Sequence, residues 1–374
     1  MPRFSQDEVE TLLWAQIDAG AFPGAVALWG QPLSAPGLAI AGLRGSSRDR
    51  RPVTADLVYD LASLTKVLAT TSLALILTAR GGLDPERPLA ETGPLAEIMP
   101  RGFRASVQWL RVTAGHLLAH QSGLRPWRPF YRLPGTTPAE RRRAALTAIF
   151  EEKPEAEPGR RTIYSDLNFI LLGLLLETLG QAPLEEQFQR EVARPLNLKA
   201  TGFRPKRGPL APTEDGFRTG GPLGHPEALT RGPTPLGRAH DDNAVFFGGV
   251  AGHAGLFAPA AEAWAIAEDW ARAWKKGRGL IFEKEALAEF IRPRPTREDP
   301  GRPWGFNRLG LVESLAAARL SPDSVGHTGY TGPAVWWDVQ NDFLWVLVCN
   351  RVHPRARNPA WRPGLVQAGP SCDL

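Results

Sequence analysis

The sequence predicts an α/β protein of the α+β type, in which an antiparallel sheet built from both chain ends is flanked by helices and carries an inserted, mostly helical lobe. Strand-like apolar runs occur near both ends, and helical patterns separated by Pro- and Gly-rich connections fill the middle. With 374 residues, 43% of them hydrophobic and 22% charged, the chain can bury a large core. We expect one lobe from residues 1–85 and 255–374, a second from residues 86–254, and an active site in the cleft between them.

The N-terminal region predicts an amphipathic helix followed by two strands. Ser5 is a suitable N-cap, and Val9, Leu13 and Ile17 follow at helical spacing. Two apolar runs, residues 24–29 and 38–43, are separated by Gly and Pro and predict a hairpin-like pair. Acidic residues stand where a signal peptide would have its apolar stretch, so we expect a cytoplasmic protein.

The tetrad Ser63-Leu-Thr-Lys66 is the first chemical signal in the chain. Helical spacing places the hydroxyl and the ammonium on one face, and a serine needs a neighbouring base or cation before it attacks a carbonyl at neutral pH. Residues 67–77 are apolar nearly all round, which predicts a buried helix that ends at Gly81. Burial would lower the pKa of Lys66 toward that of a usable base. The alternative is an N-cap serine followed by a solvated lysine.

Further helical patterns cover residues 114–120, 138–150, 166–179, 184–192, 260–275 and 283–291. Tyr164 directly precedes one of them, and Ser165 is the expected N-cap, which leaves the phenol free to point away from the helix. Residues 201–240 predict a long irregular connection of the kind that is usually functional. Residues 333–338 and 343–349 predict an antiparallel hairpin.

Composition excludes several classes of function. The net charge of +5 is scattered along the chain, so no nucleic-acid partner is expected, and no apolar stretch is long enough to predict a membrane-spanning helix. The two cysteines, Cys349 and Cys372, predict one core thiol and one tail thiol rather than a disulfide framework.

The histidines invite a metal-site interpretation. His116 and His120 have helical spacing, and His240, Asp241 and His253 could contribute further ligands, but no HExxH or Cys-containing zinc pattern is present. We expect no metal and no other cofactor, with these histidines ordering a helix end and the long loops instead.

A third polar segment, Gly326-His-Thr-Gly-Tyr330-Thr-Gly, leads into an apolar strand, and its glycines would let a substrate approach the backbone closely. Ser-x-x-Lys, then Tyr164-Ser-Asp-Leu-Asn, then His-Thr-Gly, in this order, resembles the penicillin-recognising serine hydrolases. The branch that is most similar contains class C β-lactamases, DD-peptidases and esterases. The resemblance runs from about residue 8 to residue 353 and implies a β-lactamase/transpeptidase-like fold.

The resemblance implies a role for each motif residue. Ser63 would be the acylated nucleophile, and Lys66 would stabilise its alkoxide or take its proton. Tyr164 would be the base for acylation and would later activate water; because tyrosine has a pKa near ~10, Lys66 must favour its phenolate or share the proton. The backbone N–H groups of Ser63 and Tyr330 would form an oxyanion hole. The strand flanking the substrate would hold His327, Thr328, Gly329 and Tyr330.

Two positions depart from the pattern of these relatives. Asp166 stands where many have Asn; it would either pair with Lys66 and keep it protonated, or turn away as a charge at a helix N-terminus. Asn168 is an outside candidate for the missing amide role. His327 replaces a lysine and is mostly neutral near pH ~7.5, which argues against an efficient β-lactamase but does not exclude a DD-peptidase.

We therefore expect an intracellular serine hydrolase that acts through an acyl-enzyme on carboxylic esters or small amides. A D-alanyl-D-alanine carboxypeptidase, penicillin-binding protein or weak β-lactamase is the second hypothesis, and a non-catalytic binding protein with the same fold is the third. The expected partner is a small-molecule ester, amide or β-lactam-like substrate, and the sequence leaves the oligomeric state open.

Overall fold

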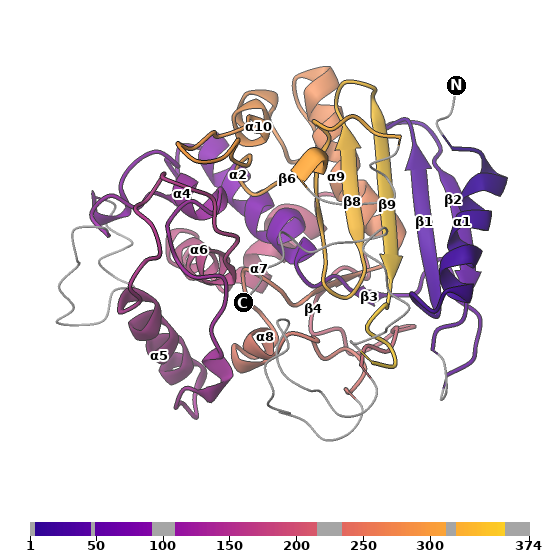
Figure 1. The fold of residues 1–374 in the computed structure, drawn as a ribbon, viewed down its shortest axis with the longest axis horizontal. Helices are drawn as coiled ribbons and strands as arrows, with labels where there is room; N and C mark the ends of the chain where they lie inside the picture. The colour runs from indigo at the N-terminus through magenta and orange to yellow at the C-terminus, as the bar shows by residue number, and fades with distance from the viewer. Residues whose placement is uncertain (1–3, 46–48, 92–108, 215–233, 312–318, 356–374) are drawn as a thin grey trace.

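A six-stranded antiparallel sheet forms one side of the molecule (Figure 1). The computed structural model describes residues 4–45, 49–91, 109–214, 234–311 and 319–355, and the statements below concern these residues. In spatial order the strands are β2 (Gly37–Gly42), β1 (Gly24–Gly30), β9 (Phe343–Cys349), β8 (Ala334–Asp338), β7 (Val325–Thr328) and β6 (Asn307–Arg308). Since β1 and β2 come from the N-terminal region and the other strands from the C-terminal region, the predicted fold class is confirmed.

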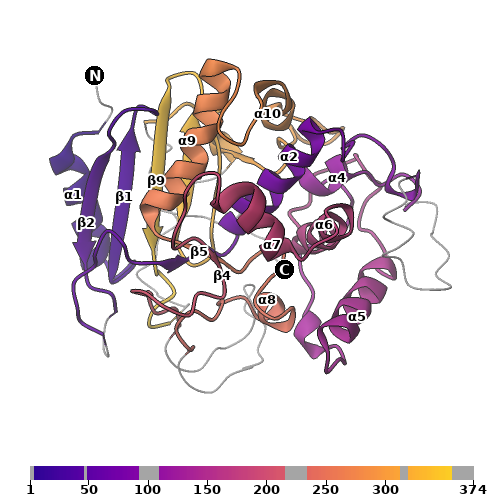
Figure 2. The same cartoon turned by 180° about the vertical axis from the view of Figure 1, so that it is seen from behind.

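Both faces of the sheet are covered, because alternate side chains of each strand point into different cores. In β1, Val26 and Leu28 belong to the main core, whereas Ala27 and Trp29 belong to a smaller core that also contains residues of α1 (Gln6–Asp18). The predicted capping box at Ser5 is present at the start of α1. The long helix α9 (Ala260–Lys276) packs on the other face of the sheet (Figure 2).

The remaining helices lie beside the sheet (Figures 1 and 2). They are α2 (Ser72–Ala79), α4 (Ala114–Leu118), α5 (Pro138–Phe150), α6 (Asp166–Leu179), α7 (Leu184–Phe188), α8 (Asp242–Phe246) and α10 (Lys284–Ile291). Two π-helical turns, Lys66–Thr71 and Gln189–Ala193, adjoin α2 and α7, and short 3₁₀ turns occur at Leu89–Glu91, Phe130–Arg132 and Leu309–Leu311. The helical patterns in the sequence thus correspond to real helices, and α4 ends earlier than predicted because His120 adopts a left-handed φ of +57°.

A second, three-stranded sheet was not predicted. It contains β3 (Tyr59–Asp60), β5 (Leu256–Ala258) and β4 (Gly202–Phe203), in the order β3-β5-β4. The pairing of Asp60 with Phe257 brings the segment before Ser63 next to the segment after His253. Strands of two or three residues are too short for a side-chain period to identify them in a sequence.

The cysteines, the long connection and the start of α6 were also predicted from the sequence. Cys349 is a buried free thiol, as predicted, whereas Cys372 and residues 215–233 of the long connection lie outside the described residues. The side chain of Ser165 does not cap α6; its hydroxyl donates to the Arg125 carbonyl oxygen at 2.6 Å. The boundaries proposed for the two lobes, at residues 85 and 254, remain a prediction.

Within the described ranges, no single helix has both the length and the apolar composition needed to cross a membrane; one bent pair, Asp166–Leu179 with Leu184–Ala193, meets those two criteria together.

Candidate active site

Ser63 lies in a tight turn between β3 and the π-helical turn that contains Lys66. Ala62 has a φ of +44°, which is uncommon for a residue with a side chain. The Asp60 carboxylate stabilises this turn by accepting the Ala62 N–H at 2.8 Å. The turn leaves Ser63 half-exposed, while Lys66 is completely buried. The nucleophile candidate is therefore open to a substrate, and the cation beside it is not open to water.

The Lys66 ammonium is surrounded by oxygen atoms of four residues, one of which is the Tyr164 hydroxyl. Its Nζ lies 2.9 Å from Ser63 Oγ, 2.7 Å from Asp166 Oδ1 and 3.1 Å from the His253 carbonyl oxygen. Burial acts to lower the pKa of Lys66, but the interactions with Asp166 and Tyr164 outweigh it, so the pKa lies above the usual lysine value. The expectation that burial would make Lys66 a base is therefore wrong. Lys66 is an ammonium that donates to the nucleophile.

The first residue of α6 explains this ionisation. Of the two orientations that the sequence left open, Asp166 takes the one that pairs its carboxylate with Lys66. Asn168 does not take over an amide role toward a substrate, because it is completely buried and its Oδ1 accepts the Ser122 hydroxyl at 2.6 Å. That outside candidate was wrong, and Asn168 helps to build the core.

Tyr164 is held from both sides by His120. The N–H of Ile163 donates to the His120 carbonyl oxygen at 2.8 Å, and the N–H of Ser165 donates to His120 Nδ1 at 3.0 Å. The two rings also pack together, with centroids 4.5 Å apart. Burial, with the nearby positive charges, keeps the pKa of His120 well below its usual range, so His120 supports Tyr164 as a neutral ring. The expectation that His120 orders the end of its helix is consistent with this geometry.

The turn between β7 and β8 packs against the backbone that precedes Ser63. β7 ends at Thr328, so Gly329 and Tyr330 belong to the turn and not to the strand, which corrects the expected extent of that strand. A Cβ on Gly329 would lie 2.5 Å from the Leu61 carbonyl oxygen, and only glycine permits this approach. Thr331 Oγ1 donates to the Asp60 carbonyl oxygen at 2.6 Å.

This packing bears on the predicted oxyanion hole. Among the described residues, neither the Ser63 N–H nor the Tyr330 N–H has a protein acceptor. Both donors lie on the two segments that touch at Gly329, and a free N–H on each is what an oxyanion hole requires. The hole remains a prediction, supported by these two uncommitted donors.

Two further side chains, His327 and Arg302, lie near Tyr164 and determine the charge around its ring. The sequence did not single out Arg302. The His327 Nδ1 lies 2.7 Å from the Thr328 carbonyl oxygen; a carbonyl only accepts, so the proton is on Nδ1 and Nε2 keeps a lone pair. Burial, together with Arg302 and Lys66, holds the pKa of His327 well below its usual range, which agrees with the neutrality expected from the sequence. The Arg302 guanidinium lies 5.1 Å from the centre of the Tyr164 ring, and burial lowers the pKa of Arg302 to about 10.

Arg302 illustrates what a motif search misses. It belongs to none of the three motifs, and one arginine among many has no pattern to distinguish it. Its Nη2 donates to Asn307 Oδ1, while its Nε has no partner among the residues described here. It enters the site only because the chain before β6 folds back over Tyr164.

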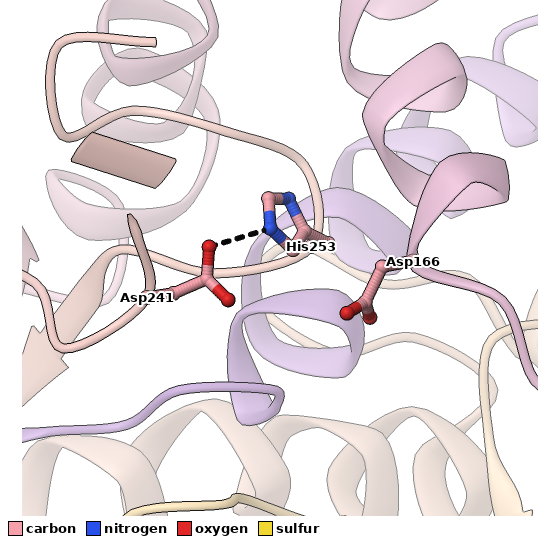
Figure 3. Close-up of side chains that lie close together, drawn as sticks. All are labelled: Asp166, Asp241 and His253. Atoms are coloured by element: carbon pink, nitrogen blue, oxygen red, sulfur yellow. Dashed lines mark hydrogen bonds and ion pairs between the residues drawn. The ribbon is translucent and has the colours of Figure 1, made fainter. Parts of the chain in front are cut away.

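Asp166, Asp241 and His253 form a compact group, with one ligand atom of each lying within 4.8 Å of the others (Figure 3). His253 Nε2 is 3.0 Å from Asp241 Oδ1, whereas Asp166 pairs with Lys66. Because the ammonium already supplies positive charge beside the carboxylates, the group does not need a cation for charge balance.

The spacing of His116 and His120 does not create a ligand pair. His116 Nδ1 accepts the Thr113 N–H at 3.2 Å, which is a helix-capping contact, and His120 Nδ1 accepts the N–H of Ser165. The expectation of no metal and no cofactor stays a prediction.

Comparison with known proteins agrees with this geometry. A model of the family described as Beta-lactamase matches residues 19–368, which is most of the chain. The chain belongs to the beta-lactamase family. This confirms the family resemblance, and with it the coarser prediction of a hydrolase of the serine β-lactamase, DD-peptidase and esterase group.

Individual relatives of this beta-lactamase-family chain have different names. A protein of Salmonella paratyphi A (strain ATCC 9150 / SARB42), provisionally named a D-alanyl-D-alanine carboxypeptidase, is 28% identical over 336 residues, which cover 87% of this chain and 77% of that protein. The structure of EstCE1, described as a hydrolase with promiscuous acyltransferase activity, matches with a TM-score of 0.69 at 21% identity, covering 91% of this chain and 92% of that one.

A third relative is an octameric penicillin-binding protein homologue from Pyrococcus abyssi. Its structure matches with a TM-score of 0.68 at 18% identity, covering 96% of this chain and 75% of that chain. At these identities the two structural matches establish the fold and leave the substrate open.

Replacing Asp166 by asparagine is expected to lower the pKa of Lys66. Burial lowers that pKa, and the Asp166 carboxylate that mainly offsets burial is then absent. In the wild type, the raised pKa stabilises the fold below the ordinary lysine pKa of about 10.4, and this contribution is lost as pH rises through the folded-state value. If the ammonium is needed for catalysis, D166N loses activity at a lower pH than the wild type does. Ester hydrolysis measured across the alkaline range checks this; coincident alkaline limbs would contradict it.

Proposed function

We propose that this beta-lactamase-family protein is a serine hydrolase that forms an acyl-enzyme on Ser63 and acts on carboxylic esters or small amides. The observation that carries the proposal is the 2.9 Å contact between the hydroxyl of Ser63, a partly exposed residue, and the buried Lys66 ammonium. A non-catalytic binding protein would have no need for a charge buried directly beneath an accessible hydroxyl.

The reaction follows from the charge state of Lys66. Since Lys66 already carries its proton, Tyr164 acts as a phenolate paired with that ammonium and takes the proton of Ser63 as Oγ bonds to the substrate carbonyl carbon. The electron pair of the carbonyl moves to its oxygen, where the N–H groups of Ser63 and Tyr330 stabilise the charge. Breaking the bond to the leaving group returns the proton from Tyr164 to that group. Water then loses a proton to Tyr164 and attacks the acyl carbon. The bond between that carbon and Ser63 Oγ breaks, and Tyr164 returns the proton to Oγ.

The preference for esters rests on what the site lacks. The ionised Asp166 only accepts hydrogen bonds and is occupied by Lys66, so it offers no donor to a side-chain amide of a substrate. His327 is neutral and keeps a lone pair on Nε2, so it provides neither a charge nor a donor at that atom. An ester without a flanking amide needs neither a hydrogen-bond donor from Asp166 nor a charge from His327. The name of EstCE1, a hydrolase with acyltransferase activity, supports the same chemistry.

Turnover of short-chain p-nitrophenyl esters tests this proposal. We expect the wild type to release nitrophenol and to show an acyl adduct on the peptide containing Ser63 after rapid acid quench. The Ser63→Ala variant serves as the blank and should show neither. Hydrolysis that is equal in the two proteins, with no adduct on the wild type, would refute the esterase proposal.

A D-alanyl-D-alanine carboxypeptidase or a penicillin-binding activity is the second candidate, and Arg302 is the observation that favours it. Its guanidinium restores the positive charge that His327 does not carry, next to Tyr164. A peptide or β-lactam substrate of such enzymes has a carboxylate, which a guanidinium can bind through two hydrogen bonds. The Salmonella relative with the carboxypeptidase name supports this candidate as well.

Arg302 separates the two candidates experimentally. If the site binds a carboxylate, Arg302→Met should lower kcat/KM for a carboxylate-bearing ester by about tenfold, the loss of one charged hydrogen bond, and barely change it for the matching neutral ester. Arg302→Lys should retain part of the preference because it keeps the charge. Equal effects on both esters would remove the argument for a carboxylate. Mass spectrometry after penicillin exposure gives an independent answer through an adduct on Ser63.

A further inference from the structure

The segment of residues 252–256 supplies one of the acceptors of Lys66. It is bound to the helical segment after Ser63 by three hydrogen bonds. Thr70 Oγ1 donates to the Gly252 carbonyl oxygen at 2.6 Å, Lys66 Nζ donates to the His253 carbonyl oxygen at 3.1 Å, and the Leu256 N–H donates to Thr65 Oγ1 at 3.0 Å. An ammonium has only three N–H groups, so the His253 carbonyl, by accepting one of them, restricts the directions of the two that remain.

The side chain of His253 is also held in place, and this fixes the position of the backbone carbonyl of the same residue. Its imidazole is 1% exposed, and Nε2 lies 3.0 Å from Asp241 Oδ1. The same Asp241 oxygen accepts the Ala244 N–H at 2.7 Å at the start of α8, so the carboxylate is itself held in place. Figure 3 shows the Asp241–His253 contact on one side of this group and the Asp166 side chain on the other.

The charges of this group act on the same ammonium. Burial acts to raise the pKa of Asp241, but its contacts with His253, the Ala244 N–H and the Lys66 charge outweigh burial, and Asp241 is an anion. Two carboxylates, from Asp166 and Asp241, therefore flank a buried region that contains Lys66. Asp166 lies 2.7 Å from Nζ, whereas Asp241 acts on it by charge and is also linked to it through His253.

We propose that Asp241 and His253 are positioning residues that fix the direction of the Lys66 ammonium toward Ser63. Asp241 holds the His253 imidazole, the imidazole holds residues 252–254 against the helical turn, and the His253 carbonyl takes one N–H of Lys66. The remaining N–H groups are then left for Ser63 and Tyr164, while Asp166 pairs with the ammonium by charge. The inference rests on the proposed hydrolase function, and it assigns to the pair a task that none of the three sequence motifs contains.

The test compares His253→Ala with His253→Gln. The glutamine amide nitrogen can reach the place of Nε2 and donate to Asp241, whereas alanine cannot. We expect His253→Ala to slow acylation of Ser63 by a fluorophosphonate probe by roughly tenfold to a hundredfold, the usual effect of a misplaced catalytic group. KM for a p-nitrophenyl ester should hardly change, and His253→Gln should recover most of the rate. His116→Ala, which removes a partly buried histidine outside this group, is the control and should acylate like the wild type.

A second readout does not depend on activity. The chain has only seven lysines, so the ¹³Cε NMR signal of Lys66 can be identified by its absence in Lys66→Met. We expect His253→Ala to shift this signal and its titration, and His253→Gln to leave both close to those of the wild type. If the wild type fails to acylate, the hydrolase proposal fails, and the NMR comparison still decides the positioning role.

Two results would overturn the inference. One is a Lys66 signal that is unchanged in folded His253→Ala. The other is a loss of the same size in the alanine and glutamine variants, since the hydrogen bond to Asp241 would then be irrelevant.

Discussion

Lys66→Met is expected to slow acylation of Ser63 by roughly 10³-fold, because the substitution removes the only charge within hydrogen-bonding distance of Oγ among the described residues. Methionine has a similar length and no charge, so the cavity around the side chain stays filled. Single-turnover labelling with a fluorophosphonate probe measures the rate without a contribution from deacylation. A variant that retains more than about a tenth of the wild-type rate would contradict the proposed role of Lys66.

The same substitution should also reduce stability, because it leaves Asp166 without its partner. The cost is expected at roughly 2–3 kcal/mol, below that of a completely buried pair, since the Asp166 side chain is 14% exposed. The double variant Lys66→Met/Asp166→Asn removes both charges and is the matched control. It should regain most of the stability in denaturant unfolding and none of the acylation rate. Parallel loss of stability and activity in both variants would mean that the effect on activity is due to unfolding.

Tyr164→Phe is expected to lower kcat for ester hydrolysis by about 10²–10³-fold, the usual contribution of a general base. The ring should keep its place, because its packing on His120 and the two backbone hydrogen bonds around it do not involve the hydroxyl. Since Tyr164 is proposed to act in both half-reactions, both acylation and release of the acyl group should slow. Stopped-flow measurement of the burst and the steady state resolves the two steps.

Tyr59→Phe is the matched control for this variant. The Tyr59 hydroxyl is buried and has no hydrogen-bond partner among the described residues, so its removal should leave activity unchanged and stability equal or slightly higher. A kcat for Tyr164→Phe within a few-fold of the Tyr59→Phe value would exclude Tyr164 as the base.

Sequence reasoning succeeded where a regular pattern extends over many residues. The apolar runs of α6 and α9 repeat at helical spacing for several turns, and β8 and β9 are joined by a turn too short for anything but a hairpin. The same holds for the motif residues Ser63 and Lys66, whose relation depends on a local helical geometry. Such features require no knowledge of the rest of the chain.

It failed where a structure depends on two distant segments. β3, β4 and β5 have two or three residues each, so their pairing partners define them and their own side chains do not. Arg302 lies beside Tyr164 because of the path of the chain before β6, and no pattern in the neighbouring residues predicts this position. Ser165 looked like a cap, but the Arg125 carbonyl offered its hydroxyl a better acceptor.

The ionisation of Lys66 separates what the sequence predicts from what only the tertiary structure decides. The sequence by itself determined the fold class, the family and the three motifs that contain Ser63, Tyr164 and His327, because these depend on local periodicity and on motifs in a given order. Whether Lys66 is a base or an ammonium was decided only by the tertiary structure. Burial alone lowers the pKa of a lysine, and a carboxylate 2.7 Å away reverses the outcome, so the sign depends on where Asp166 points.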